Sequence, residues 1–107
     1  MSHVTTHVLD TAIGAPAAGV RVSLTGPDGA LIATGSTDAD GRVAHLGPDR
    51  LTPGEYRLDF TTAAYFGATG RPSFYPRAVV YFMVEDAPHY HVPLLLSPFG
   101  YSTYRGS

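Results

Sequence analysis

The chain has 107 residues, of which 44% are hydrophobic and 15% are charged, and its formal net charge at pH 7 is -2. These totals predict a single globular domain over residues 1–107 and exclude a disordered chain. They also give no basic surface for nucleic acid or an anionic membrane. Because cysteine is absent, disulfides, thiolate catalysis and cysteine-bound zinc are excluded.

No targeting or membrane signal is visible in the sequence. The first ten residues, MSHVTTHVLD, lack the apolar centre of a signal peptide, and no apolar run approaches the length of a membrane span. The final Arg-Gly-Ser is not a peroxisomal tripeptide of the Ser-Lys-Leu type. We therefore expect a cytoplasmic protein that binds neither membrane nor nucleic acid.

Short strands separated by turns make up the first half of the chain. The segment GVRVSLTG alternates, with Val20, Val22 and Leu24 on one face and polar side chains on the other. Pro-Asp-Gly and Asp-Ala-Asp-Gly are turn signals between such segments. In chain order, we expect strands at residues 3–11, 19–26, 30–37 and 42–46.

The second half continues the same pattern, with one exception. Residues 61–70, TTAAYFGATG, do not alternate, and they predict a short helix capped by threonine and ended by glycine. Further strands are expected at residues 52–60, 77–86, 89–96 and 99–106. The whole pattern predicts an all-β fold, an antiparallel β-sandwich of seven to eight strands with one short helix.

Two histidines stand out in HYHVPLLL. His89 and His91 are two residues apart in a predicted strand, so they project from the same face, about 6–7 Å apart. Pro93 follows on that face, and since proline cannot donate to a sheet ladder, we expect the strand to be interrupted or at an edge there. The pair indicates a functional site, although two histidines on a solvated edge face are an open alternative.

His7 and Arg42 are weaker candidates on local pattern alone. His7 lies among β-branched residues of the first strand, and Arg42 follows the Asp-Gly turn near the rim of a sheet. On local pattern alone, a structural role is favoured for His7 and a solvated role beside the hairpin is favoured for Arg42. Nothing converges around His3 or His45.

Three histidines and an arginine allow two chemistries. In the first, neutral imidazole activates water and arginine polarises a carbonyl, with no metal or other cofactor. In the second, the histidines bind zinc and leave its fourth position open. The spacing does not choose between them.

Longer motifs resemble a known family. The prealbumin-like (transthyretin-like) β-sandwich group is resembled by three segments, VLDTAIGAPAAGVRVSL, TDADGR and TPGEYRL. Adhesin and carboxypeptidase-associated modules, which only bind or stiffen, show much the same pattern. The C-terminal HYHVPLLLSPFGYSTYRGS is more specific and resembles the 5-hydroxyisourate hydrolases, the enzymatic relatives of transthyretin, whose chains end in Tyr-Arg-Gly-Ser.

This resemblance implies a site and a reaction. It assigns catalytic roles to His7, Arg42, His89, His91 and Ser107, substrate contacts to His7, Arg42 and Tyr104, and no metal or cofactor. The implied small-molecule substrate is 5-hydroxyisourate, whose ring amide is opened on the way from urate to allantoin.

General chemistry then suggests a role for each residue. His7 or His91 deprotonates a water, and Arg42 stabilises charge on the attacked carbonyl. His89 orients a neighbouring group or passes protons, while Ser107 acts through its hydroxyl or its terminal carboxylate.

The resemblance also implies an assembly. It suggests a homotetramer, a dimer of dimers, with the sites at the dimer–dimer interface and the C-terminal tail lining them. A transthyretin-like carrier of small ligands and a three-histidine zinc hydrolase are the alternatives.

Overall fold

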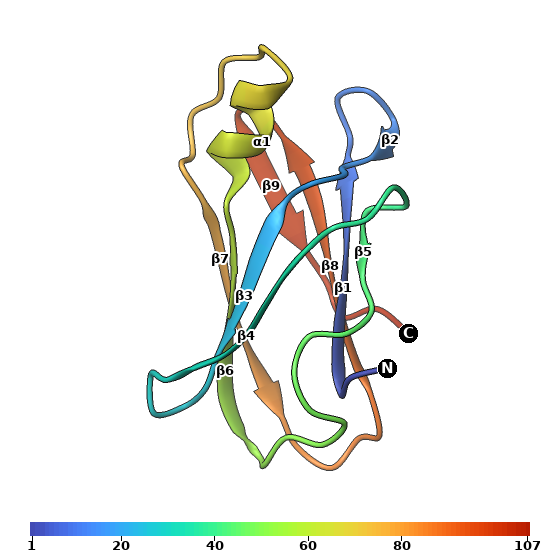
Figure 1. Cartoon of the computed structure of the whole chain (residues 1–107), viewed down its shortest axis with the longest axis vertical. Helices are drawn as coiled ribbons and strands as arrows, with labels where there is room; N and C mark the ends of the chain where they lie inside the picture. Colours follow the sequence, from blue (N-terminus) through green and yellow to red (C-terminus); the bar gives the residue numbers. More distant parts are fainter.

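Two β-sheets pack as two layers in the computed structural model, which describes all 107 residues (Figure 1). One sheet has the order β4-β3-β6-β7, and the other has the order β2-β1-β8-β9 with β5 also paired to β1. The strands are β1 (Val4–Asp10), β2 (Ala15–Pro16), β3 (Arg21–Thr25), β4 (Leu31–Ser36), β5 (Arg42–Val43), β6 (Gly54–Phe60), β7 (Ala78–Val84), β8 (Tyr90–Ser97) and β9 (Gly100–Thr103). The predicted sandwich is confirmed, and two strands of two residues each, β2 and β5, bring the strand number above the expected seven to eight.

Alternation along each strand decides which side chains enter the core. In β1, Val4 and Val8 are fully buried between the sheets, whereas His7 and Leu9 lie on the outer face and are only partly covered. In β8, Val92 and Leu94 point inward in the same way and His91 points outward. The functional candidates of these two strands therefore share the outer face of one sheet.

One strand pair departs from the antiparallel expectation. β1 and β8 run parallel, with Thr5 opposite His91 and His7 opposite Pro93, while the other strand pairs are antiparallel. Such a pairing joins segments that are more than 80 residues apart in the sequence, so no hairpin or local turn signals it. It places the N-terminal candidate His7 beside the C-terminal histidine pair.

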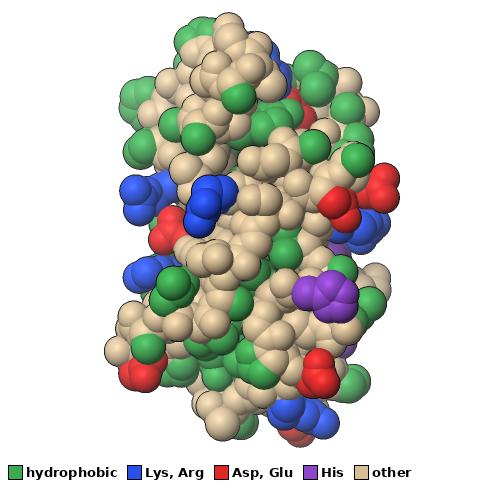
Figure 2. All heavy atoms as spheres, viewed as in Figure 1, with side chains coloured by type: hydrophobic (Ala, Val, Ile, Leu, Met, Phe, Trp, Pro, Cys, Tyr) green, Lys and Arg blue, Asp and Glu red, His purple; other side chains and the backbone are tan.

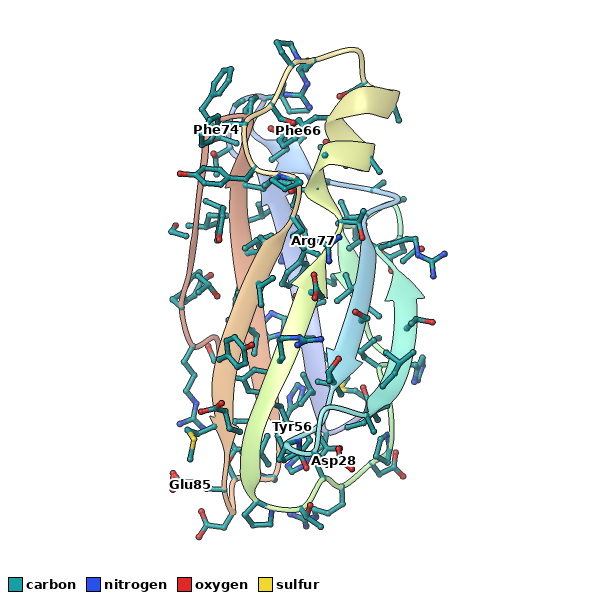
Figure 3. The ribbon with its side chains drawn as sticks, turned by 90° about the vertical axis from the view of Figure 1, so that its left-hand side faces the viewer. Asp28, Tyr56, Phe66, Phe74, Arg77 and Glu85 are labelled. Carbon is teal, nitrogen blue, oxygen red and sulfur yellow. The ribbon has the colours of Figure 1, made fainter.

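The single helix, α1 (Thr62–Ala68), covers one end of the sandwich, where Phe66 and Phe74 lie, far from Tyr56 at the other end (Figures 1 and 3). Thr61 occupies the N-cap position but its side chain makes no capping hydrogen bond, so the expected threonine cap is wrong. Gly70 follows the helix with a φ of 70°, a left-handed conformation suited to glycine. No helix of the structure has the length and apolar character that crossing a membrane requires.

Pro93 interrupts pairing on one side of β8 only. Toward β1 the ladder continues past it to Leu96, so the strand is neither ended nor at an edge. Toward β9 the ladder stops at the pair Leu94 and Thr103, and the Thr103 hydroxyl donates to the Pro93 carbonyl at 2.7 Å. The predicted interruption therefore affects only the pairing of β8 with the C-terminal segment after Thr103. Pairing of that segment resumes in a single bridge between His91 and Gly106.

A buried carboxylate ties β1 to the segment after the helix. Asp10 is fully buried and accepts hydrogen bonds from the Tyr65 hydroxyl, at 2.8 Å, and from the guanidinium of Arg71. The same guanidinium lies 5.1 Å from the centre of the Phe66 ring. Burial raises the pKa of Asp10, but the bonds from Arg71 and Tyr65 outweigh it and hold the pKa below its usual value.

Asp10→Asn should therefore lower the free energy of unfolding by about 2–4 kcal/mol at pH 7, because it leaves the Arg71 charge without its counterion. A carboxyl with a lowered folded-state pKa stabilises the protein above its unfolded value, near 3.9, and this contribution is lost as pH falls through the folded value. Urea unfolding should show that the difference in free energy of unfolding between variant and wild type becomes smaller below about pH 4. The exposed Asp49→Asn is the matched control, and a gap that stays constant with pH would contradict the account.

Candidate active site

The site lies on the outer face of the sheet that contains β1 and β8. Both chain ends reach this region, beside one half of β1 and β8 (Figure 1). In the space-filling view, which has the same orientation, the visible histidine atoms lie on the side of the molecule where the two chain ends are marked in Figure 1 (Figure 2). An outward-facing position leaves the side chains open to a ligand while the strands hold their backbones rigidly.

Thr5 joins the histidine pair into one unit. Its Oγ1 is 2.9 Å from Nε2 of His89 and 2.9 Å from Nδ1 of His91, and the two ring centres are 6.4 Å apart. The spacing matches the 6–7 Å expected from the sequence. Neither Nδ1 of His89 nor Nε2 of His91 has a hydrogen-bond partner within the chain, so one nitrogen of each ring is available for other contacts.

These residues line a cavity of about 180 Å³ on the outer face. Arg42 of β5 and the terminal residue Ser107 line it together with the histidine pair. The complete lining is Met1, Thr5, Thr6, Arg42, Ala44, His89, His91 and Ser107. The structure therefore brings four of the predicted residues, Arg42, His89, His91 and Ser107, to one place from three separate parts of the chain.

The tight turn before β5 fixes the position of Arg42. The Asp38 carboxylate accepts the backbone N–H of Arg42 at 3.0 Å, and the Arg42 carbonyl accepts the N–H of Asp38 at 3.0 Å. Gly41 has a φ of 76°, and a Cβ there would lie 2.4 Å from the Val8 carbonyl oxygen, so only glycine fits. Arg42 is exposed, lines the cavity and makes no ion pair within the chain.

His7 lies next to the cavity but does not line it. In the sheet register it is opposite Arg42 on one side and opposite Pro93 on the other. Its ring makes no hydrogen bond within the chain, and its charged form acts on His91 through space. In the single chain, His7 therefore lies near the other candidate residues but is not part of the cavity that they line.

His91 is held in its neutral form. Burial lowers the pKa of its imidazole below the usual value of 6.5, and the nearby charges of Arg42, His7 and His89 lower it further. A hydrogen bond with the backbone of Thr5 acts in the opposite direction but is outweighed. At neutral pH the ring therefore offers a lone pair, as a general base requires.

The C-terminal tail packs on His91. The N–H of Gly106 donates to the His91 carbonyl at 2.9 Å, and a Cβ on Gly106 would lie 2.6 Å from Cδ2 of the imidazole. Glycine is therefore needed here for close approach, and this contact delivers Ser107 to the cavity.

Tyr104 lies elsewhere. It lines a larger hollow of about 480 Å³ between β7 and β8, together with Arg105, whose guanidinium lies 5.0 Å from the centre of the Tyr90 ring. His91 reaches both cavities. The single chain therefore does not bring Tyr104 into the cavity of the histidine pair.

Thr5 is the polar residue that sequence reasoning missed. Its position on the same face as His7 was visible in the alternation of residues 3–11. What could not be read from the pattern is the parallel pairing that sets it opposite His91. A threonine among β-branched neighbours is otherwise an ordinary strand residue.

The histidines are not arranged as metal ligands. No group of three or more His, Cys, Asp or Glu side chains is placed to hold a metal ion. His89 and His91 instead share a hydroxyl, and His3 is used structurally: its Nδ1 accepts the Leu51 N–H at 2.9 Å and its Nε2–H donates to the Ala87 carbonyl at 2.8 Å. Activity measured with and without a chelator is therefore the test between the two chemistries considered from the sequence.

The fold and the site together define a transthyretin-like β-sandwich with a histidine–arginine site on one outer face. The chain belongs to the HIUase/Transthyretin family, whose model matches residues 4–106. It is 47% identical to the 5-hydroxyisourate hydrolase of Caulobacter vibrioides, with all of both chains covered.

Solved structures of this family have the same fold as this chain. Klebsiella pneumoniae 5-hydroxyisourate hydrolase matches with a TM-score of 0.91 and 43% identity, covering 99% of this chain and 100% of the other. Sea bream transthyretin in complex with thyroxine also gives a TM-score of 0.91, at 35% identity, covering 97% of this chain and 94% of the other. The fold alone therefore does not distinguish a hydrolase from a carrier.

Proposed function

We propose that this protein is a 5-hydroxyisourate hydrolase, which opens a ring amide of its substrate during urate degradation. The observation that carries the proposal is the shared cavity of Arg42, His89, His91 and Ser107, in a chain 47% identical to a hydrolase over its full length. The cavity offers a neutral imidazole, a cation and a hydroxyl group side by side. Those are the groups that attack of water on a carbonyl requires.

The positions of these groups support hydrolysis by direct attack of water. Nε2 of His91 takes a proton from water while the water oxygen bonds to the ring carbonyl carbon. The guanidinium of Arg42 stabilises the negative charge that develops on the carbonyl oxygen, through paired N–H donors. The carbon–nitrogen bond then breaks, and the proton held by His91 passes to the leaving ring nitrogen. The ring is then open and carries a carboxylic acid, which becomes a carboxylate by losing its proton to solvent.

The remaining residues bind the substrate or orient the reacting groups. His7 lies opposite Arg42 in the sheet register, close to His91, and it contacts the substrate or replaces His91 as the base. Ser107 offers its hydroxyl and its terminal carboxylate to the substrate, to water or to Arg42. Tyr104 belongs to the substrate site only if the tail or a second subunit brings it there.

Assembly as a homotetramer, a dimer of dimers, fits the shape of the site. Ligand pockets usually enclose about 300–1,000 Å³, and the cavity here is smaller and lies on an outer sheet face. A second subunit placed against this face would complete the walls. Light scattering on the purified protein tests the tetramer independently of activity.

A carrier of small aromatic ligands is the rival, because sea bream transthyretin shares the fold. The histidine pair and its hydroxyl bridge favour chemistry over storage. Freshly generated 5-hydroxyisourate should lose its absorbance much faster with catalytic amounts of the protein than in buffer. Decay at the buffer rate, with thyroxine bound stoichiometrically, would support the carrier instead.

The pH dependence of kcat/KM should report the lowered pKa of His91. A base acts only in its neutral form, so activity is full above its pKa and falls as pH drops through it. Since that pKa lies below 6.5, we expect the acidic midpoint below about pH 6.5. The rate of substrate decay measured from pH 5 to pH 8 checks this, and a midpoint above pH 7 would contradict it.

A further inference from the structure

The bridging hydroxyl of Thr5 restricts where hydrogens can sit on the two imidazoles. The side chain is 7% exposed, and its Oγ1 has two hydrogen-bond partners, Nε2 of His89 and Nδ1 of His91. A hydroxyl carries one hydrogen, so it can donate to only one of these nitrogens. If both nitrogens donated to it instead, its own hydrogen would be buried without a partner, at a free-energy cost.

Two neutral arrangements satisfy every group. In the first, His91 donates through Nδ1 to Thr5, Thr5 donates to Nε2 of His89, and Nε2 of His91 keeps a free lone pair. In the second, all these bonds point the other way, and Nε2 of His91 carries a hydrogen. Two protons shifting through the hydroxyl exchange the two arrangements only when Nε2 of His91 also gains a proton and Nδ1 of His89 also loses one, so the exchange is linked to proton uptake and release at the outer ring nitrogens.

We propose that Thr5 is a positioning residue that fixes complementary tautomers on His89 and His91 and carries a proton between the two rings. This inference rests on the proposed hydrolase function and deepens it. In the first arrangement the bare Nε2 of His91 is the base that activates water. The role of His89 is then to hold the charge that this step creates.

The proton steps balance. When Nε2 of His91 takes the proton of water, its Nδ1 proton passes to Thr5 as the Thr5 proton passes to Nε2 of His89. The positive charge then rests on His89, while His91 is neutral and carries its hydrogen on Nε2. As the leaving ring nitrogen takes that hydrogen, the reverse shift through Thr5 restores both rings to their starting state.

A threonine outside the site provides an internal contrast. Thr37 is also buried, but its hydroxyl donates to the Ala17 carbonyl at 2.6 Å and accepts the Val20 N–H at 2.9 Å, and it contacts no titratable group. It does not line the cavity of the histidine pair. The two residues have the same side chain and both are buried, so Thr37 serves as the control for Thr5.

The test compares Thr5→Val, Thr5→Ser and Thr37→Val in the full chain. Valine keeps the shape of threonine and removes the hydroxyl, and serine keeps the hydroxyl. We expect Thr5→Val to lower kcat about 10- to 100-fold while KM changes less than about threefold, as for a lost buried hydrogen bond that acts in the transition state. Thr5→Ser should recover most of kcat, and Thr37→Val should lower stability with little change in kcat.

Nitrogen NMR of the histidine rings gives a readout that needs no substrate. The wild type should show one tautomer on each ring, complementary between His89 and His91, and Thr5→Val should show mixed tautomers on both. Unchanged tautomers or an unchanged kcat in Thr5→Val, or an equal loss of kcat in Thr37→Val, would overturn the proposal. Because the tautomers are measured without substrate, their result stands apart from whether the protein hydrolyses 5-hydroxyisourate.

Discussion

His91→Ala should lower kcat by about 10²–10⁴ while the sandwich and its stability stay nearly unchanged. The imidazole is the neutral group of the cavity whose Nε2 is free to accept a proton, and its loss removes the general base. Its side chain lies on the outer face of the sheet, so its removal leaves the core intact. Single-turnover and steady-state decay of 5-hydroxyisourate measure the effect.

His45→Ala is the matched control for that variant. His45 is exposed and does not line the cavity, so its replacement should leave kcat within about twofold of the wild type. If both variants kept full activity in correctly folded protein, the assignment of His91 as the base would be wrong.

Deleting residues 104–107 should abolish most activity, with a fall in kcat of at least about 100-fold. The deletion removes Ser107 from the cavity and Gly106 from the ring of His91, so the imidazole loses the backbone that covers it. It retains β9 and the Thr103 bond to Pro93, so folding and assembly should suffer less than activity. Light scattering and the decay assay on the same sample separate the two effects.

Two point variants refine the tail experiment. Gly106→Ala keeps the length and the terminal carboxylate but forces a Cβ against His91, and it should also lower kcat. Ser102→Ala removes an exposed hydroxyl of β9 outside the cavity and should change nothing. Full activity in the truncated protein would show that the tail is an ordinary terminus.

Much of the fold could be predicted because strand alternation is a local signal. The segment 3–11 contains β1 because it is rich in β-branched residues, and residues 52–60 contain β6 because apolar and polar side chains alternate there. The segment 42–46 yielded only a two-residue strand, since its pairing is limited to the part of β1 opposite Thr6 and His7. The last strand ends at Thr103 because Pro93 has no N–H to continue the ladder.

The site was predicted less completely because it depends on contacts between distant segments. The separation of His89 and His91 follows from strand geometry, whereas the placement of His7 and Arg42 near them came from the family resemblance. Thr5 was missed because its importance arises from the parallel pairing of β1 with β8. Tyr104 lies outside the cavity in the single chain, and a site shared between subunits cannot be read from one chain.

The central claim is that a histidine, not a bound metal, activates water in the cavity that His91 lines. The most direct test is the decay rate of freshly generated 5-hydroxyisourate, measured side by side for untreated wild type, wild type stripped with a chelator, and His91→Ala. The account predicts the same fast rate for both wild-type samples and a rate about 10²–10⁴ lower for His91→Ala. Loss of activity on stripping with recovery on adding zinc, or full activity in His91→Ala, would contradict it.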